Sequence, residues 1–310
     1  MKHLYLALSL GILTTLFVIP YPVYADGTGL TVSPAILELH GTPPADIISP
    51  ITLENQADAS LQLQILLKPF KQAPSEDGKI EYLTSQSSEM SFLPNVSIVD
   101  HDTAISALTL GPKQKKTVTL KIALPNTTAL TDHYFSVVFL SIPQNPTTTN
   151  LQDKNTISLI QSGIGIPILL SVASDNHVSG FLEGFSAPVF QQTGPVDFRL
   201  RIKNSGEHFI TPRGTIMITN MFGQTVGRVD LPEANILAHT TRSIQKSWPE
   251  KFLLGFYTAT LSLALSDQGP VYTREVSFAS FPFQAFFVLV LISSISFVLV
   301  RRVRKKLAEE

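Results

Sequence analysis

VDFRLRIK, residues Val196 to Lys203, is the clearest structural signal of the 310-residue chain. Apolar residues occupy every second position, from Val196 to Ile202, and charged residues occupy the positions between them. A period of two residues is that of a strand with one face on the core and one in water. Residues 257–266 (YTATLSLALS) repeat the alternation. These two stretches predict β-sheet structure in the second half of the chain.

The first half has the same character, because short apolar runs rich in Val, Ile, Thr and Phe alternate with turn residues. The runs are Leu30–Leu39, Ile47–Glu54, Leu61–Phe70, Phe92–Val99, Ala104–Leu110, Thr117–Leu124, Tyr134–Ile142 and Ile157–Val172. The pattern restarts after Ser174-Asp175-Asn176 and ends with a strand over Val271–Phe278. The sequence predicts an all-β chain of two tandem immunoglobulin-like β-sandwiches, residues 26–174 and 175–280.

Two loops and two tyrosines leave alternatives open. The polar loops Lys71–Glu89 and Pro143–Asp153 are long enough to be either padding or functional edges. Tyr134 and Tyr257 each lie just inside a long strand. Each is either a tyrosine corner, whose hydroxyl bonds to backbone at the preceding turn, or an ordinary aromatic residue of a strand.

The stretch Phe281–Val300 predicts a single transmembrane helix. Its twenty residues contain no charge, and Arg301, Arg302, Arg304, Lys305 and Lys306 follow at once. A helix of this length spans about 30 Å, the thickness of the hydrocarbon core. Lys and Arg mark the cytoplasmic side, so residues 301–310 are predicted to form a basic cytoplasmic tail.

The N-terminus reads as a secretory signal peptide over residues 1–25. A polar start at Lys2 and His3 precedes the apolar run Leu4–Ile19, and small residues before Asp26 form a cleavage site. An uncleaved anchor is the alternative. In both cases residues 26–280 are expected to be extracytoplasmic. With the signal peptide as the leading interpretation, a single-pass protein of the cell membrane is predicted.

The amino-acid composition excludes several kinds of chemistry and argues against one class of partner. Cysteine is absent, which excludes disulfides and thiolate chemistry and fits a bacterial envelope. Without Lys2 and the tail, the chain holds 17 basic and 22 acidic residues, a net charge of about −5. A mildly acidic exterior argues against nucleic acid as a partner.

The chain shows no pattern that predicts an enzyme, a cofactor or a metal site. Asp100-His101-Asp102 is the most suggestive polar group, and ordinary turn residues explain it better than a cation site. Gly163-Ile164-Gly165-Ile166-Pro167 lacks the third glycine of a nucleotide loop and reads as a strand with close packing or a bulge. No catalytic, cofactor-binding, metal-ligating or other binding residue is predicted.

The order of these segments resembles two related families. Val32-Ser33-Pro34-Ala35, Ile51 to Asn55, Leu110-Gly111-Pro112 and Leu124-Pro125 resemble the N-terminal half of the pilus-chaperone-like immunoglobulin fold. Ile202 to Phe209, Pro212-Arg213-Gly214, Trp248-Pro249 and Gly255 to Ala259 resemble the membrane-proximal domain of bacterial WxL-interacting-type cell-surface proteins. The basic pair that anchors a client's C-terminus in pilus chaperones has no clear equivalent, because Lys113, Lys115 and Lys116 read as a solvated turn.

The resemblance implies two extracytoplasmic β-sandwiches on a membrane anchor, with binding to peptidoglycan or to surface proteins. We therefore expect a non-enzymatic binding or adhesion protein, tethered through Phe281–Val300, that contacts cell-surface protein or cell-wall polymer. The alternative is a membrane-tethered chaperone for secreted or surface subunits. In either case, the main binding region is expected in residues 26–174, farthest from the membrane.

Overall fold

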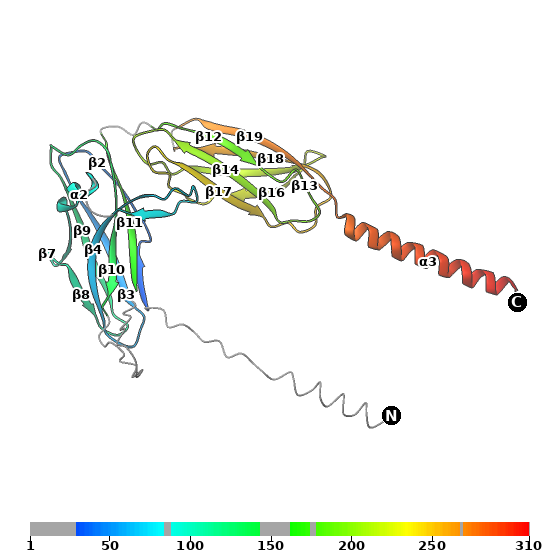
Figure 1. Ribbon diagram of the computed structural model, residues 1–310, viewed down its shortest axis with the longest axis horizontal. Coiled ribbons are helices and arrows are strands. Elements are labelled where there is room, and N and C mark those ends of the chain that lie inside the picture. Colours follow the sequence, from blue (N-terminus) through cyan, green and yellow to red (C-terminus); the bar gives the residue numbers. More distant parts are fainter. Residues whose placement is uncertain (1–28, 84–87, 143–161, 174–177, 267–268, 310) are drawn as a thin grey trace, which may run out of the picture.

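The computed structural model describes residues 29–83, 88–142, 162–173, 178–266 and 269–309. Strands make up most of this chain and one long helix ends it, so the predicted all-β class with a C-terminal helix is confirmed at this level (Figure 1). The predicted signal peptide, the loop Pro143–Asp153 and the boundary at Ser174–Asn176 lie outside the described residues.

Two sheets form the first sheet pair. One has the order β1-β3-β9-β6-β7, and the other has the order β2-β11-β10-β4-β5, with β8 also paired to β4. Their bounds are β1 Leu30–Ser33, β2 Leu37–Gly41, β3 Ala45–Asn55, β4 Leu61–Gln72, β5 Ile80–Tyr82, β6 Val96–Asp100, β7 Thr103–Ala104, β8 Ala107–Leu110, β9 Lys115–Leu124, β10 Asp132–Ser141 and β11 Gly163–Val172.

Alternation places the core of the first sheet pair between its two sheets. Val118, Leu120 and Ile122 of β9 meet Phe135, Val137 and Phe139 of β10, and all six are at most 1% exposed. Burial of side chains this large stabilises each by roughly 1.5–3 kcal/mol. The short helix α2 (Ser88–Phe92) and a 3-10 turn (Leu93–Asn95) close one end of this core.

The second sheet pair combines the sheets β12-β14-β17 and β13-β19-β18-β15-β16. The bounds are β12 Gly180–Ser186, β13 Phe190–Gln191, β14 Val196–Asn204, β15 Arg213–Asn220, β16 Thr225–Asp230, β17 Thr241–Trp248, β18 Gly255–Ala264 and β19 Val271–Ser280. The stretch VDFRLRIK lies in β14, where Val196, Phe198, Leu200 and Ile202 are fully buried. The two pairs have separate cores. They also pack on each other, so their status as independent domains stays a prediction.

A buried asparagine recurs at the same place in both pairs. Asn55 ends β3 and Asn204 ends β14, and both are fully buried. Each side-chain oxygen accepts the N–H two residues on, at 3.0 Å from Ala57 and 2.9 Å from Gly206. Each amide nitrogen donates to the carbonyl four residues on, in both cases at 2.8 Å. The two sheet pairs thus share the same hydrogen-bond arrangement around a buried asparagine at the end of a strand.

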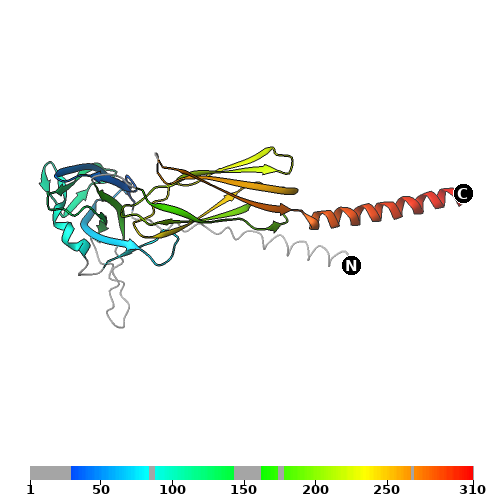
Figure 2. The same ribbon diagram turned by 90° about the horizontal axis from the view of Figure 1, so that it is seen from above.

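The helix α3, Phe283–Glu309, leaves the far end of the second sheet pair (Figures 1 and 2). Its segment 283–302 has a mean hydropathy of 2.5 and none of it is buried against the rest of the described chain. Phe281 and Pro282 alone separate it from β19, and a proline just before a helix suits the first turn. The helix starts two residues later than predicted and continues through the basic residues.

Several local predictions were wrong. Phe92 to Asn95 are helical, and the predicted strand Leu30–Leu39 is split because the chain passes from one sheet to the other after Ser33. Lys115 and Lys116 lie in β9 and not in a turn. The loop Lys71–Glu89 contains the end of β4, all of β5 and the start of α2.

The tyrosine corner exists at Tyr257 and not at Tyr134. The Tyr257 hydroxyl accepts the N–H of Leu254 at 3.0 Å and donates to its carbonyl at 3.3 Å. Tyr134 falls on the face of β10 opposite to Phe135, and its hydroxyl accepts the N–H of Ala238 in the second sheet pair at 3.1 Å. A shift of one residue along a strand reverses the face, so similar local sequence gives different partners.

Candidate functional site

The hairpin of β4 and β5 reaches from the first sheet pair onto the second. The Ser243 N–H donates to the Glu76 carbonyl at 2.7 Å, and the Gln72 amide donates to the Thr241 carbonyl, also at 2.7 Å. Two nitrogens of the Arg201 guanidinium donate hydrogen bonds to the Glu76 carboxylate, at 2.7 and 2.5 Å. The hydrogen bond from Arg201 holds the pKa of Glu76 below its ordinary value. The hairpin therefore fastens the two pairs together.

A buried carboxylate makes the second connection. Asp132, with its side chain 2% exposed, opens β10. One of its oxygens accepts the Phe209 N–H at 2.5 Å and the Tyr134 hydroxyl at 2.7 Å, and the other lies 2.7 Å from His208 Nδ1. A buried carboxylate is tolerated only with such partners. The contact joins segments 77 positions apart and fixes how the pairs meet.

An apolar cluster fills the space around these polar contacts. Phe70 and Leu169 come from the first sheet pair, Phe209 and Leu237 come from the second, and all four are at most 7% exposed. Figure 1 shows the two pairs meeting at an angle, with the first at the end opposite to α3. Shared burial and hydrogen bonds together make the junction a packed interface and not a flexible linker.

Half of strand β11 has an open edge beside this junction. On one side β10 covers it at nine positions, from Leu140↔Gly163 to Asp132↔Ser171. On the other side, β2 covers only Ile168 to Val172. Among the residues that the structure describes, no strand pairs with the outer side of Gly163 to Ile166. We call Gly163 to Pro167, the stretch that ends where the pairing with β2 begins, the β11 edge.

The register shows which backbone groups the β11 edge presents. Ser141 donates its N–H to the Ser162 carbonyl, so Ile164 and Ile166 bond to β10 by the alternation of an antiparallel ladder. Gly163, Gly165 and Pro167 therefore direct their backbone groups outward. The outward carbonyl of Pro167 is taken up by the parallel pairing of Ile168 with Leu37, and Pro167 has no N–H. Two N–H and two carbonyl groups, those of Gly163 and Gly165, therefore face the open side. This is a template for one more strand.

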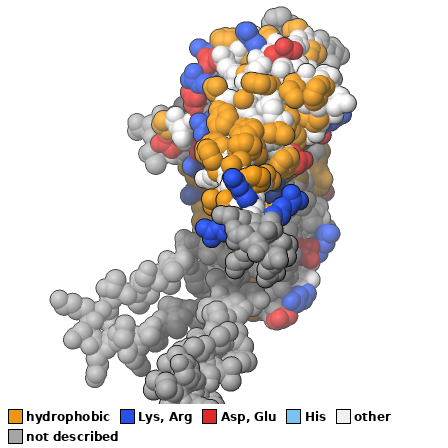
Figure 3. Space-filling view, turned by 90° about the vertical axis from the view of Figure 1, so that its right-hand side faces the viewer, with side chains coloured by type: hydrophobic (Ala, Val, Ile, Leu, Met, Phe, Trp, Pro, Cys, Tyr) orange, Lys and Arg blue, Asp and Glu red, His pale blue; other side chains and the backbone are white. Residues whose placement is uncertain are grey.

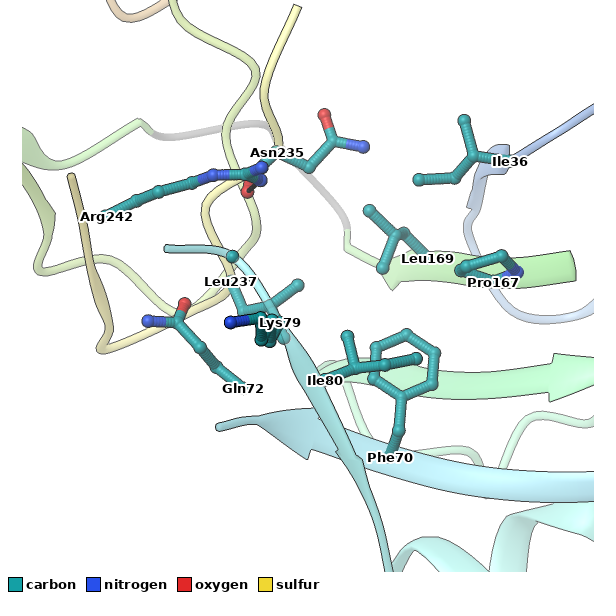
Figure 4. A pocket seen from close by; sticks show the side chains of 11 residues that line it. Ile36, Phe70, Gln72, Lys79, Ile80, Pro167, Leu169, Asn235, Leu237 and Arg242 are labelled. Carbon is teal, nitrogen blue, oxygen red and sulfur yellow. Dashed lines mark hydrogen bonds between the residues drawn. The ribbon is translucent and has the colours of Figure 1, made fainter. Parts of the chain in front are cut away.

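The β11 edge runs into a cavity of about 190 Å³ at the junction (Figure 4). Pro167 and Leu169 of β11 form part of its apolar wall, together with Phe70, Ile80, Ile36 and Leu237. Gln72, Lys79, Asn235 and Arg242 supply its polar groups. Small-molecule sites usually enclose about 300–1,000 Å³. The cavity is therefore better suited to one side chain of a protein than to a cofactor.

Arg242 gives this cavity a cationic side. Its guanidinium donates to the Asn235 carbonyl at 2.5 Å, and burial lowers the pKa of Arg242 while Asp77 nearby opposes that shift. Gly78 lies against the guanidinium with φ of 84°, and a Cβ there would be 2.4 Å from Arg242 Cζ. Only glycine fits this left-handed position, so the hairpin turn is built around the arginine.

The sequence motifs have clear places in the structure. Gly163 to Pro167 form a regular strand, and a Cβ on Gly165 would meet the Tyr82 hydroxyl at 3.0 Å, which confirms the close-packing interpretation. Asp100 ends β6, and His101 and Asp102 form the turn to β7. Ion pairs join Asp100 to Lys116 at 2.5 Å and Asp102 to Lys121 at 2.9 Å. That turn was the favoured interpretation.

The junction residues were missed by sequence reasoning. Asp132 was not singled out, and His208 was only one position of the segment Ile202 to Phe209 that carries a family resemblance. The available signals were a carboxylate directly before an apolar strand and a Gly78 turn followed by the short run Ile80 to Tyr82. Neither signal names a partner.

No family model matches the chain, and no curated protein sequence matches it. Similar solved structures include the class 5 fimbriae chaperone CfaA, 10% identical over 81% of this chain and 99% of that one, with a TM-score of 0.40. The CupB2 chaperone of Pseudomonas aeruginosa is 8% identical over 80% and 100%, with a TM-score of 0.38. A chaperone–tip adhesin complex of CFA/I fimbriae is 9% identical over 79% and 97%, with a TM-score of 0.40.

TM-scores below 0.5 do not establish a relationship. The resemblance to WxL-interacting-type proteins stays a prediction, because none of these comparisons tests it.

Proposed function

We propose that this protein is a membrane-anchored, extracytoplasmic binding protein that captures an extended segment of a partner protein along the β11 edge. The observation that carries the proposal is that the pairing with β2 begins at Ile168, so that no described strand pairs with the outward backbone groups of Gly163 and Gly165. It acts by binding and not by catalysis. The partner is a protein of the envelope or cell surface.

The spacing of the edge groups favours a protein over a peptidoglycan strand. Successive outward groups on alternate residues of β11 match the donors and acceptors of another β-strand, which is how strand addition gives affinity. The cavity at the end of the edge adds selectivity, because it accepts a side chain between apolar walls and the Arg242 guanidinium.

The membrane anchor is supported by α3. Its apolar segment is long enough to span a bilayer, is not buried against the described chain, and ends in Arg301 and Arg302. With a cleaved or uncleaved N-terminal segment before residue 26, both sheet pairs lie outside the cytoplasm. The basic end of α3 lies inside it.

A membrane-tethered chaperone for surface subunits is the second candidate, and the same edge favours it. An open strand edge stabilises a client that still lacks a strand of its own sheet. A mature adhesion partner would remain bound to the protein, whereas a client would bind only between its export and its assembly.

Two variants at one position test the edge. Gly165→Pro removes the outward N–H without touching the ladder to β10, whereas Gly165→Ala keeps the N–H and adds the same Cβ near the Tyr82 hydroxyl. We expect crosslinking in intact cells to recover an envelope protein with the full-length chain and with Gly165→Ala, and to lose it with Gly165→Pro.

Equal recovery with both variants would exclude the edge as the binding site. Recovery of no protein by the unmodified chain would exclude the binding function itself. A pulse–chase separates the two candidates, since only a client disappears from the complex during the chase.

A further inference from the structure

Large apolar side chains gather at one end of the second sheet pair. They lie at the start of β13, in the loop between β15 and β16, in the loop between β17 and β18, and at the start of β18. The set is Phe190, Met221, Phe222, Phe252, Leu254 and Phe256, each at least 50% exposed, and we call it the apolar tip. Single exposed apolar residues are ordinary on a protein surface, but a contiguous group marks an interaction site.

The strand register places the apolar tip beside the start of α3. Gly255 pairs with Ser280 at the end of β19, and Asn220 pairs with Tyr257 beside them. Phe190 pairs with Ala279, and its ring stacks on Phe283 of α3 at a centroid distance of 6.5 Å. Figure 3 looks at the end from which α3 leaves; α3 points toward the viewer, so its own exposed hydrophobic side chains stand in front of this end.

Charge does not explain this surface. In the segments that carry the tip, residues 187–192, 220–226 and 249–256, the charged residues are Glu250 and Lys251, whose charges cancel. An acidic or basic protein partner would find little to recognise. A surface dominated by phenylalanine and leucine with neutral polar neighbours is suited to the boundary between headgroups and acyl chains.

We propose that the apolar tip lies in the interfacial layer of the same bilayer that α3 enters, so that the second sheet pair docks on lipid. The proposal rests on α3 being a membrane anchor. Because only Phe281 and Pro282 separate β19 from α3, the tip cannot move far from the membrane surface. The continuity of Phe190 with Phe283 makes lipid, and not a second protein, the occupant that the geometry favours.

The absence of cysteine makes a direct test possible, because one introduced cysteine carries one label. We would place an environment-sensitive fluorophore at Phe222→Cys or Phe252→Cys in the full-length protein in phosphatidylcholine–phosphatidylglycerol nanodiscs. The matched control is Val271→Cys, which is 63% exposed at the opposite end of β19. Lipids spin-labelled near the headgroup would serve as quenchers.

We expect several-fold stronger lipid quenching at positions 222 and 252 than at 271. Quenching equal to that at 271 overturns the proposal, and so does energy transfer between tip labels of two copies, which would indicate tip-to-tip pairing. A label at Ile295→Cys separates the two levels of inference. If spin labels at the bilayer centre quench the label at position 295, but headgroup spin labels do not quench the tip labels, α3 is a membrane anchor and the docking of the tip on lipid is refuted.

Discussion

Replacing Asp132 tests whether the two sheet pairs behave as one unit. Asp132→Ala removes the acceptor for the Phe209 N–H and the Tyr134 hydroxyl and leaves His208 without its carboxylate. A hydrogen bond to a charged group contributes roughly 1.5–3 kcal/mol, and a buried donor left unpaired costs roughly 1–3 kcal/mol. Tyr134 keeps the Ala238 N–H, which limits the loss.

We therefore expect Asp132→Ala to lower the free energy of unfolding by about 2–4 kcal/mol. Asp132→Asn keeps one acceptor oxygen for Phe209 and should cost less, about 1–2 kcal/mol. The control is Asp58→Ala, because that side chain is 91% exposed with one ion pair to Lys113. Such a surface change should stay within about 0.5 kcal/mol.

Urea titration of the full-length protein in detergent measures these changes. The chain has one tryptophan, Trp248, which is 5% exposed in the core of the second sheet pair and reports its unfolding. Far-UV circular dichroism reports both pairs. In the unmodified protein the two transitions should coincide, and in Asp132→Ala they should separate. A midpoint shift no larger than that of Asp58→Ala would refute the reasoning.

Two further predictions concern the repeat and the hairpin. Asn204→Ala and Asn55→Ala each remove a fully buried amide that bonds several carbonyls, and each should cost about 2–4 kcal/mol in the same urea titration; a cost below that of a surface change would contradict the structural role. Arg201 holds the pKa of Glu76 below its ordinary value of 4.5, so their ion pair stabilises the junction above that pH and is lost as the pH falls below it. The urea midpoint of the unmodified protein should therefore fall between about pH 5 and pH 3, and Glu76→Gln should make that fall smaller. An unchanged fall in the variant would exclude this ion pair as its cause.

The strands and the tyrosine corner could be predicted from the sequence where a local pattern determines them. Residues 196–203 alternate without a break, and they form a buried strand at that place, because alternation follows directly from the geometry of a half-buried strand. The corner at Tyr257 was also accessible, since its partner Leu254 is three residues away. The strand at Gly163 to Pro167 could be predicted because it, too, follows from the local sequence.

The junction could not be predicted in this way, because its contacts join distant parts of the chain. Nothing near Asp132 indicates that its partner is Phe209, and nothing near Glu76 indicates Arg201. Likewise, the openness of the β11 edge depends on where β2 ends, and not on the sequence of β11. Local patterns therefore predict the strands, whereas the candidate site depends on how distant strands meet.

The length of the second sheet pair sets the distance between the start of α3 and the β11 edge. Strand β19 runs for ten residues from Val271 to Ser280, about 33 Å at the rise of a strand, and its Ser280 end adjoins α3. The first sheet pair, with β11, lies beyond its other end (Figure 1). With α3 in a bilayer, the second sheet pair acts as a rigid spacer, so a partner must extend a segment on the order of 30 Å from the lipid to be caught. Reach, as well as chemistry, then selects the partner.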